Sequence, residues 1–113
     1  MITIEKLKAY GANVDEGLQR CMNNKDFYLM LVNKSLNNNQ IPELEIAIKN
    51  NDFQRGFEIA HSLKGVYGNL SITPLFNAIV EITELLRNRV AMDYNPLLNK
   101  IKNLYQSLVD LAL

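Results

Sequence analysis

The chain has 113 residues, with 12 Lys and Arg, 12 Asp and Glu and one His, so its formal net charge at pH 7 is zero. This length fits a single domain over residues 1–113, and 48% hydrophobic with 21% charged residues is typical of a globular protein rather than a disordered one. The balanced charge argues against nucleic-acid binding, while one Cys and one His exclude a disulfide framework and metal sites built on Cys or His clusters.

No apolar run approaches the roughly 18 residues that a membrane-spanning helix needs, so no membrane association is expected. The first ten residues, MITIEKLKAY, lack the apolar stretch of a secretory signal. A reducing cytoplasm is the simplest compartment for a chain with one Cys.

The N-terminal residues are expected to form two short helices. Thr3 is a plausible N-cap for the first helix, and Gly11 is placed to stop it. The second helix should begin near Asp15. Its predicted inward-facing residues are Leu18, Cys21 and Met22.

The next segment contains several helix breakers. Asn23 and Asn24 should end the second helix, and Asp26 is the expected N-cap of a helix over residues 27–36. The Asn run at 37–39 should end that helix, because Pro42 favours a new start at the first helical position. One long helix kinked at Pro42 is the alternative.

Three longer helices are expected in the rest of the chain. Asp52 is the expected N-cap of a helix that runs to about Leu70. Thr73 and Pro74 are the expected N-cap and first helical residue of a helix that ends near Asn88, and Asn95-Pro96 repeats this start signal for the last helix. Each of the last two carries apolar residues at spacings of three and four. Short connections favour antiparallel neighbours, so the predicted fold is an all-α, up-and-down four-helix bundle with additional short N-terminal helices.

The lone His lies within the predicted helix 53–70. At about 100° per residue, the apolar residues of this helix gather on one stripe opposite His61, so His61 should face solvent. The stripe comprises Gly56, Ile59, Ala60, Leu63, Val66, Tyr67 and Leu70.

The solvent-facing side around His61 has an unusual composition. The residues within about 60° of it are Gln54, Phe57, Lys64, Gly65 and Gly68. Two glycines in a helix interior cost roughly 0.5–1 kcal/mol each relative to Ala, and here they point away from the core. They leave bare backbone beside the imidazole, as a closely docking partner requires. Phe57 should be exposed and add an apolar contact, and Gln54 belongs to the same docking face.

Two residues of this face suit phosphoryl chemistry. Histidine side chains are largely neutral at pH 7, and a ring nitrogen with a free lone pair can accept a phosphoryl group without a separate base. Lys64 is three residues after His61, where its ammonium group can reach over the ring and offset phosphoryl charge. Taken singly, an exposed His or Lys is most often an ordinary surface residue, so the hypothesis depends on the joint arrangement.

The segment Ala60-His61-Ser62-Leu63-Lys64-Gly65, continued by Val66-Tyr67-Gly68-Asn69-Leu70, resembles the signature of histidine-containing phosphotransfer (HPt) domains, A-H-x-L-K-G followed by small residues and N-[LIV]-G. Residues 14–21, 26–28 and 51–53 also look like the corresponding regions of this family. The resemblance thus covers about residues 10–90.

The resemblance implies a monomeric four-helix bundle that relays phosphoryl groups in a two-component phosphorelay. His61 matches the phosphorylated residue, Lys64 the residue that assists the phosphoryl group, and Gly65 the position left bare for a receiver domain. The partners implied are a response-regulator receiver domain and a sensor or hybrid histidine kinase. The chain itself would be a phosphocarrier without autokinase activity and without a cofactor, since the Mg²⁺ belongs to the receiver.

The sequence departs from the family pattern at three points. Ser71 stands where Gly is common, and we expect it to cap the following helix. Tyr67 replaces a small residue and should face the core. No Gln occurs between Ser71 and Asn88, although some members use a Gln on that helix to bond the imidazole.

Two other functions are compatible with the sequence. A non-catalytic adaptor or inhibitor could dock a receiver or kinase through the same bundle without phosphoryl transfer. An enzyme with His61 as general base is a weaker option, because the predicted face offers no concave, water-excluded setting. No metal site is expected.

Overall fold

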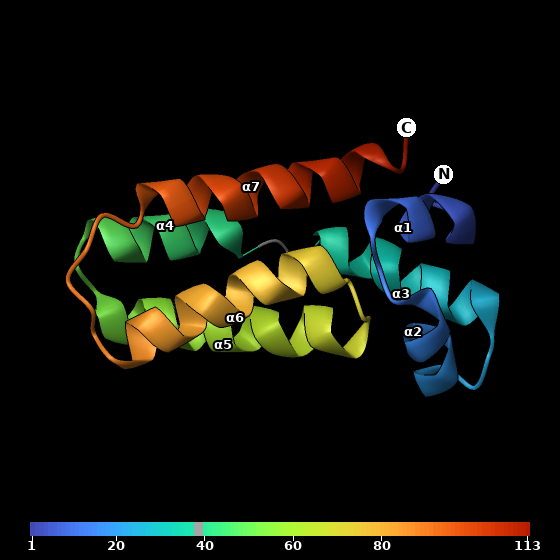
Figure 1. Ribbon diagram of the computed structural model, residues 1–113, viewed down its shortest axis with the longest axis horizontal. Helices are drawn as coiled ribbons and strands as arrows, with labels where there is room; N and C mark the ends of the chain where they lie inside the picture. The colour runs from blue at the N-terminus through green and yellow to red at the C-terminus, as the bar shows by residue number, and fades with distance from the viewer. Residues whose placement is uncertain (38–39) are drawn as a thin grey trace.

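The computed structural model describes residues 1–37 and 40–113, and these residues form seven helices and no strand (Figure 1). The all-α prediction is therefore confirmed for the described residues. In chain order the helices are α1 (Ile4–Tyr10), α2 (Val14–Arg20), α3 (Lys25–Asn37), α4 (Ile41–Lys49), α5 (Phe53–Asn69), α6 (Thr73–Arg87) and α7 (Asn95–Asp110).

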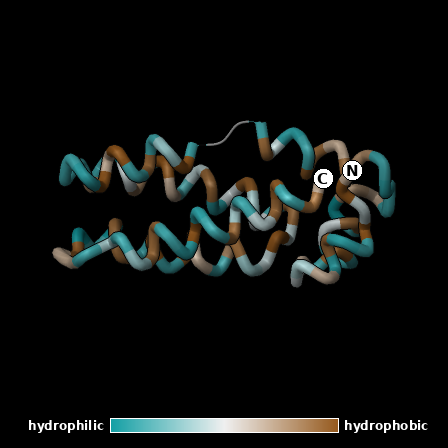
Figure 2. The backbone as a smooth tube through the Cα atoms, turned by 90° about the horizontal axis from the view of Figure 1, so that it is seen from above, coloured by the Kyte–Doolittle hydropathy of each residue, from teal (hydrophilic) through white to brown (hydrophobic). Residues whose placement is uncertain are grey.

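Helices α4 to α7 lie side by side as a bundle, while α1, α2 and α3 gather at the end of the bundle where α5 finishes (Figure 1). The most extensive packing joins α5 to α6, followed by α5 to α4 and α6 to α7. Hydrophobic and hydrophilic residues alternate along each helix (Figure 2), because each helix turns one apolar face toward the core. Within the described residues, no helix has the length and apolar character needed to span a bilayer.

Several helix boundaries follow from the local signals in the sequence. The Thr3 hydroxyl oxygen accepts a hydrogen bond from the backbone N–H of Lys6, and Gly11 ends α1 in the left-handed region at φ 109°. Asp52 caps α5 by accepting a hydrogen bond from the backbone N–H of Arg55 at 3.1 Å. These three predictions are confirmed.

Two predictions in the α2–α3 region are wrong. Asn24, rather than Asp26, caps α3, since its side-chain oxygen accepts a hydrogen bond from the backbone N–H of Phe27 at 3.0 Å. Met22 does not face inward but is 91% exposed. The reason is that α2 ends at Arg20, so Met22 lies in a turn at φ 56° where helical spacing no longer determines its direction.

Helices α3 and α4 are separate elements. Helix α3 ends at Asn37, Gln40 is non-helical, and Pro42 lies in the first turn of α4, as the Pro signal predicts. The alternative of one helix kinked at Pro42 is therefore wrong. The predicted break at 37–39 falls partly outside the described residues, because 38 and 39 are not among them.

The turn between α5 and α6 contains the departure from the family pattern at Ser71. Ser71 has φ 55°, a region that favours glycine, and it does not cap α6. The N-cap of α6 is Ile72 and Thr73 is its first helical residue, so the prediction of Thr73 as N-cap is wrong by one residue. Its buried hydroxyl accepts a hydrogen bond from Arg20 Nη1 at 2.7 Å and donates one to Glu16 Oε1 at 3.1 Å. These contacts offset the conformational cost of a non-glycine residue here.

The same region attaches α2 and α3 to the end of α5. Arg20 Nη1 also donates to the backbone oxygens of Gly68 and Asn69, at 3.1 and 3.4 Å, which places a cation at the negative end of the α5 dipole. The hydroxyl of the buried Tyr28 donates to the backbone oxygen of Leu70 at 2.7 Å. Helices α2 and α3 are therefore held directly to the helix that carries His61.

Candidate functional site

His61 lies in the middle of α5, and its side chain is exposed, which confirms the prediction that it faces solvent. Within the described residues the imidazole makes no hydrogen bond, and α6 contributes no Gln that could orient it. Its ring contact is with Phe57, one turn earlier: the ring centroids are 5.7 Å apart and the planes differ by 24°. Among the described residues, the imidazole is therefore oriented by stacking on Phe57 rather than by a hydrogen bond.

Phe57 differs from its prediction, because it is partly buried rather than exposed. The guanidinium carbon of Arg87, on α6, lies 5.0 Å from the centre of the Phe57 ring, a cation–π contact. Arg87 is in turn held by Glu84, with 3.3 Å between Nε and Oε2. Since both His61 and Arg87 cover its ring, Phe57 is part of the support of the imidazole rather than a free docking contact.

The two glycines of the predicted docking face have different surroundings. A Cβ atom built on Gly65 would meet nothing within 4 Å, so the backbone beside His61 is open, as predicted. A Cβ built on Gly68 would lie 2.8 Å from Cε1 of Phe76, on α6. The prediction that Gly68 is bare for a partner is therefore wrong: its missing side chain lets α5 and α6 approach closely.

Lys64 and Gln54 also lie on this face. Lys64 is partly buried, and among the described residues its ammonium group makes no hydrogen bond or ion pair, so the cation predicted beside His61 is uncommitted. Gln54 is exposed, but it donates a hydrogen bond to Glu58 at 3.1 Å and accepts one from Arg89 at 3.5 Å. Its docking role stays a prediction.

Sequence reasoning missed Arg87 and Phe76, which lie on α6 against Phe57 and Gly68. A usable signal was present, because α5 and α6 are antiparallel across a short turn centred near Ile72. Phe57 and Arg87 are equally far from Ile72 along the chain, as are Gly68 and Phe76. A helical hairpin that turns at residue 72 would therefore have predicted both contacts, Phe57 with Arg87 and Gly68 with Phe76. Across the described residues, no three His, Cys, Asp or Glu side chains are grouped so that they could hold a metal ion.

The model of the Hpt domain family matches residues 35–111, which is well over half of the chain. The upstream segments of the resemblance, at 14–21 and 26–28, lie outside this match. No curated protein matches the chain, and no solved structure does either. The chain belongs to the Hpt domain family, whose role in two-component signalling is phosphotransfer.

Proposed function

We propose that this protein carries a phosphoryl group on His61 between the aspartates of receiver domains, or from a sensor kinase to a response regulator. The observation that supports this most directly is the exposed imidazole beside the open backbone of Gly65, in a chain of the Hpt domain family. The protein acts as a monomeric cytoplasmic phosphocarrier without autokinase activity, and α4 to α7 serve as an up-and-down four-helix scaffold.

The reaction uses the lone pair of the unprotonated ring nitrogen of His61. That nitrogen attacks the phosphorus of the partner's phosphoaspartate in line, an N–P bond forms, and the P–O bond to the aspartyl carboxylate breaks. The carboxylate leaves on the partner, and the reverse transfer runs through the same geometry. Lys64, uncommitted within the described part of the chain, offsets the phosphoryl charge. The Mg²⁺ belongs to the receiver, so this chain mainly contributes positioning.

The imidazole is held for this attack by the ring of Phe57, which Arg87 covers. Aromatic pairs of this kind contribute about 0.5–1.5 kcal/mol, and an exposed ring without a hydrogen bond otherwise rotates about its side-chain bonds. Phe57 is therefore a positioning residue: it limits the directions in which the nucleophilic nitrogen points.

Replacing Phe57 by Leu should slow phosphoryl transfer about threefold to tenfold, because the stacking energy that orients the imidazole is lost. The measurement is the single-turnover rate constant at saturating protein concentration. Phe57→Tyr keeps the ring and should transfer at the wild-type rate. If Phe57 only filled space, the rate constants of the Tyr and Leu variants would be similar. Equal rate constants for Phe57→Leu and wild type would show that stacking does not orient the nucleophile.

The proposed function is tested by mixing the protein with a radiophosphorylated receiver domain and Mg²⁺. We expect label on this chain that is labile in acid and stable in alkali, the behaviour of a phosphoramidate. His61→Gln should carry no label, while its helicity and melting temperature match those of the wild type because the side chain is exposed. Label that persists in His61→Gln would refute the assignment. Binding of receivers without transfer would favour the adaptor.

A further inference from the structure

The seven helices form two groups that meet at one joint. In the described part of the chain, every helix pair whose backbones approach closely at more than isolated points lies within one group. These pairs are α4–α5, α5–α6 and α6–α7 in the bundle, and α1–α2 and α2–α3 at its end (Figure 1). Helices α1, α2 and α3 are here called the cap. Side chains, rather than close backbone contact, therefore join the cap to the bundle.

Two tyrosine hydroxyls of the cap donate hydrogen bonds across the joint. The hydroxyl of Tyr10, on α1, donates to the backbone oxygen of Leu104, on α7, at 2.8 Å. The hydroxyl of Tyr28, on α3, donates to the backbone oxygen of Leu70, at the end of α5, at 2.7 Å. The cap is thus attached to two different helices of the bundle by the same kind of bond.

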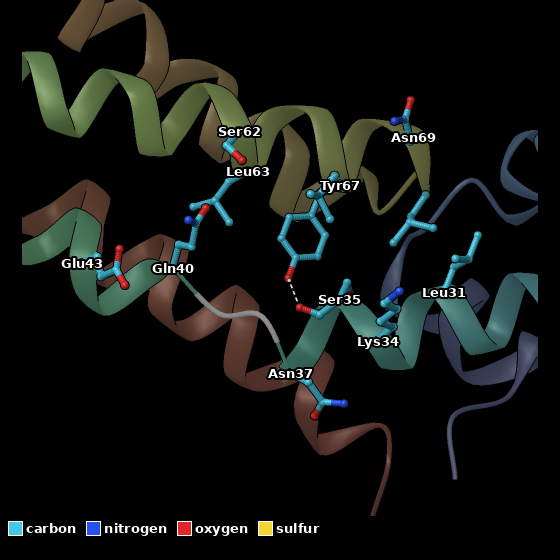
Figure 3. A pocket seen from close by; sticks show the side chains of 12 residues that line it. Leu31, Lys34, Ser35, Asn37, Gln40, Glu43, Ser62, Leu63, Tyr67 and Asn69 are labelled. Atoms are coloured by element: carbon cyan, nitrogen blue, oxygen red, sulfur yellow. Dashed lines mark hydrogen bonds between the residues drawn. The ribbon is translucent and has the colours of Figure 1, made fainter.

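Two further tyrosine hydroxyls cross the joint in the opposite direction. Tyr67, on α5, donates to the backbone oxygen of Ser35 at 3.4 Å (Figure 3), and Tyr105, on α7, donates to that of Leu36 at 2.8 Å. Both oxygens belong to the last turn of α3, where carbonyl groups have no partner within their own helix. The bundle therefore supplies the bonds that complete the carboxyl end of α3.

A cavity lies beside these bonds, between α3, the start of α4 and α5 (Figure 3). It has a volume of about 720 Å³, and its walls include Leu31 and Ser35 on the cap side and Leu63 and Tyr67 on the bundle side. Side chains that line a cavity make fewer van der Waals contacts than those in a close-packed interior. On this side of the joint, apolar packing therefore contributes less to closure, and the hydroxyl bonds matter more.

We propose that the cap opens away from the bundle as one cooperative unit, at a lower free energy than unfolding of the whole protein, and that the four tyrosine bonds set how rarely it opens. Parts of a protein that are sparsely packed against the rest open in this way. The closed state dominates, because Tyr28 and Val32 of α3 are completely buried. Burial raises the pKa of Tyr28 and of Tyr67 to about 12, so both hydroxyls remain donors at neutral pH.

Opening of the cap changes the end of the helix that carries His61. In the open state Arg20 loses its bonds to the backbone oxygens of Gly68 and Asn69, in the last turn of α5. A ligand that prefers the closed cap therefore also stabilises this turn. The opening does not require phosphoryl transfer, so its test is independent of the test of the proposed function.

The test is native-state hydrogen exchange of the full chain, followed amide by amide with NMR at rising, sub-denaturing concentrations of denaturant. The slowest amides of α1, α2 and α3 should converge on one opening reaction with a common denaturant slope. They should exchange faster than the slowest amides of α5 and α6, which require unfolding of the whole protein.

Three conservative variants identify the opening reaction. Tyr28→Phe and Tyr105→Phe each remove a bond that is broken both when the cap opens and when the whole protein unfolds. They should speed the slowest amides of cap and bundle by the same factor, about fivefold. The matched control is Tyr94→Phe, because the Tyr94 hydroxyl donates to the backbone oxygen of Val90 at 2.7 Å within the α6–α7 connection. This bond survives opening of the cap, so the control should speed the bundle amides and leave the cap amides within a factor of two.

Equal acceleration of cap and bundle amides by Tyr94→Phe would overturn the proposal, because the cap would then open only when the whole protein unfolds. Different denaturant slopes for α1, α2 and α3 would also overturn it, since these helices would then open separately. If neither Tyr28→Phe nor Tyr105→Phe accelerated the cap amides, the hydroxyl bonds would not hold the cap closed. Circular dichroism verifies that each variant keeps the helix content of the wild type.

Discussion

Replacing Gly65 by Gln is expected to reduce phosphoryl transfer at least about a hundredfold while the fold is retained, because displacing reacting groups by an ångström already costs that much. A Cβ at this position meets nothing within 4 Å, so the isolated protein has room for the new side chain. Gln is also the better helix former by roughly 0.5 kcal/mol. In the proposed transfer, however, the side chain would occupy the space beside His61 through which the partner's aspartate approaches.

The measurements for Gly65→Gln are the transfer rate and the thermal unfolding midpoint, with two alanine variants as controls. Gly65→Ala adds one carbon in open space, so it should melt no lower than the wild type and keep more transfer than Gln. Gly68→Ala should melt lower than Gly65→Ala, because its Cβ meets the Phe76 ring at 2.8 Å. Undiminished transfer by Gly65→Gln would mean that the partner approaches His61 from another side.

Replacing Gly17 by Ala is expected to destabilise the protein by about 2 kcal/mol, the largest effect on stability that we predict for a single added carbon. The new Cβ would lie 2.6 Å from Cε1 of Tyr28 and 3.0 Å from the backbone oxygen of Leu70. Tyr28 is completely buried, and its hydroxyl bond to Leu70 prevents the ring from moving aside without a further loss. This cost exceeds the roughly 1 kcal/mol that Ala gains over Gly in a helix.

Chemical denaturation of Gly17→Ala should show a lower midpoint with an unchanged slope, and thermal unfolding should shift down by about 10 °C. Gln19→Ala, at an exposed position of the same helix, should stay within about 0.5 kcal/mol of the wild type. If Gly17→Ala unfolded at the wild-type midpoint, α2 would not pack against Tyr28 as closely as the structure has it.

Helix positions in this chain could be predicted largely from signals that act over three or four residues. The caps at Thr3 and Asp52, the stop at Gly11 and the start at Pro42 are local features, since each concerns the backbone groups of one helix end. The prediction for Met22 was wrong because it assumed that α2 continues to that residue. The prediction of Asp26 as the cap of α3 was also wrong; Asn24 holds that position, and Asn and Asp are equally common as N-caps.

The candidate site was predictable to the extent that it depends on a single helix. Helical spacing places His61 on the solvent side with Gly65 beside it, and the structure agrees. The errors at Phe57 and Gly68 share one cause: in both cases the surroundings are supplied by α6, through Arg87 and Phe76. The periodicity of one helix says which way a side chain points but not which neighbour already occupies the space.

The bonds that tie α2 and α3 to the end of α5 have a consequence for which sequence changes the fold tolerates. Arg20 and Tyr28 donate hydrogen bonds to backbone oxygens at the end of α5, and every residue type supplies such an oxygen. The side chains at positions 69 and 70 can therefore change in evolution without loss of the bonds that hold α2 and α3 in place.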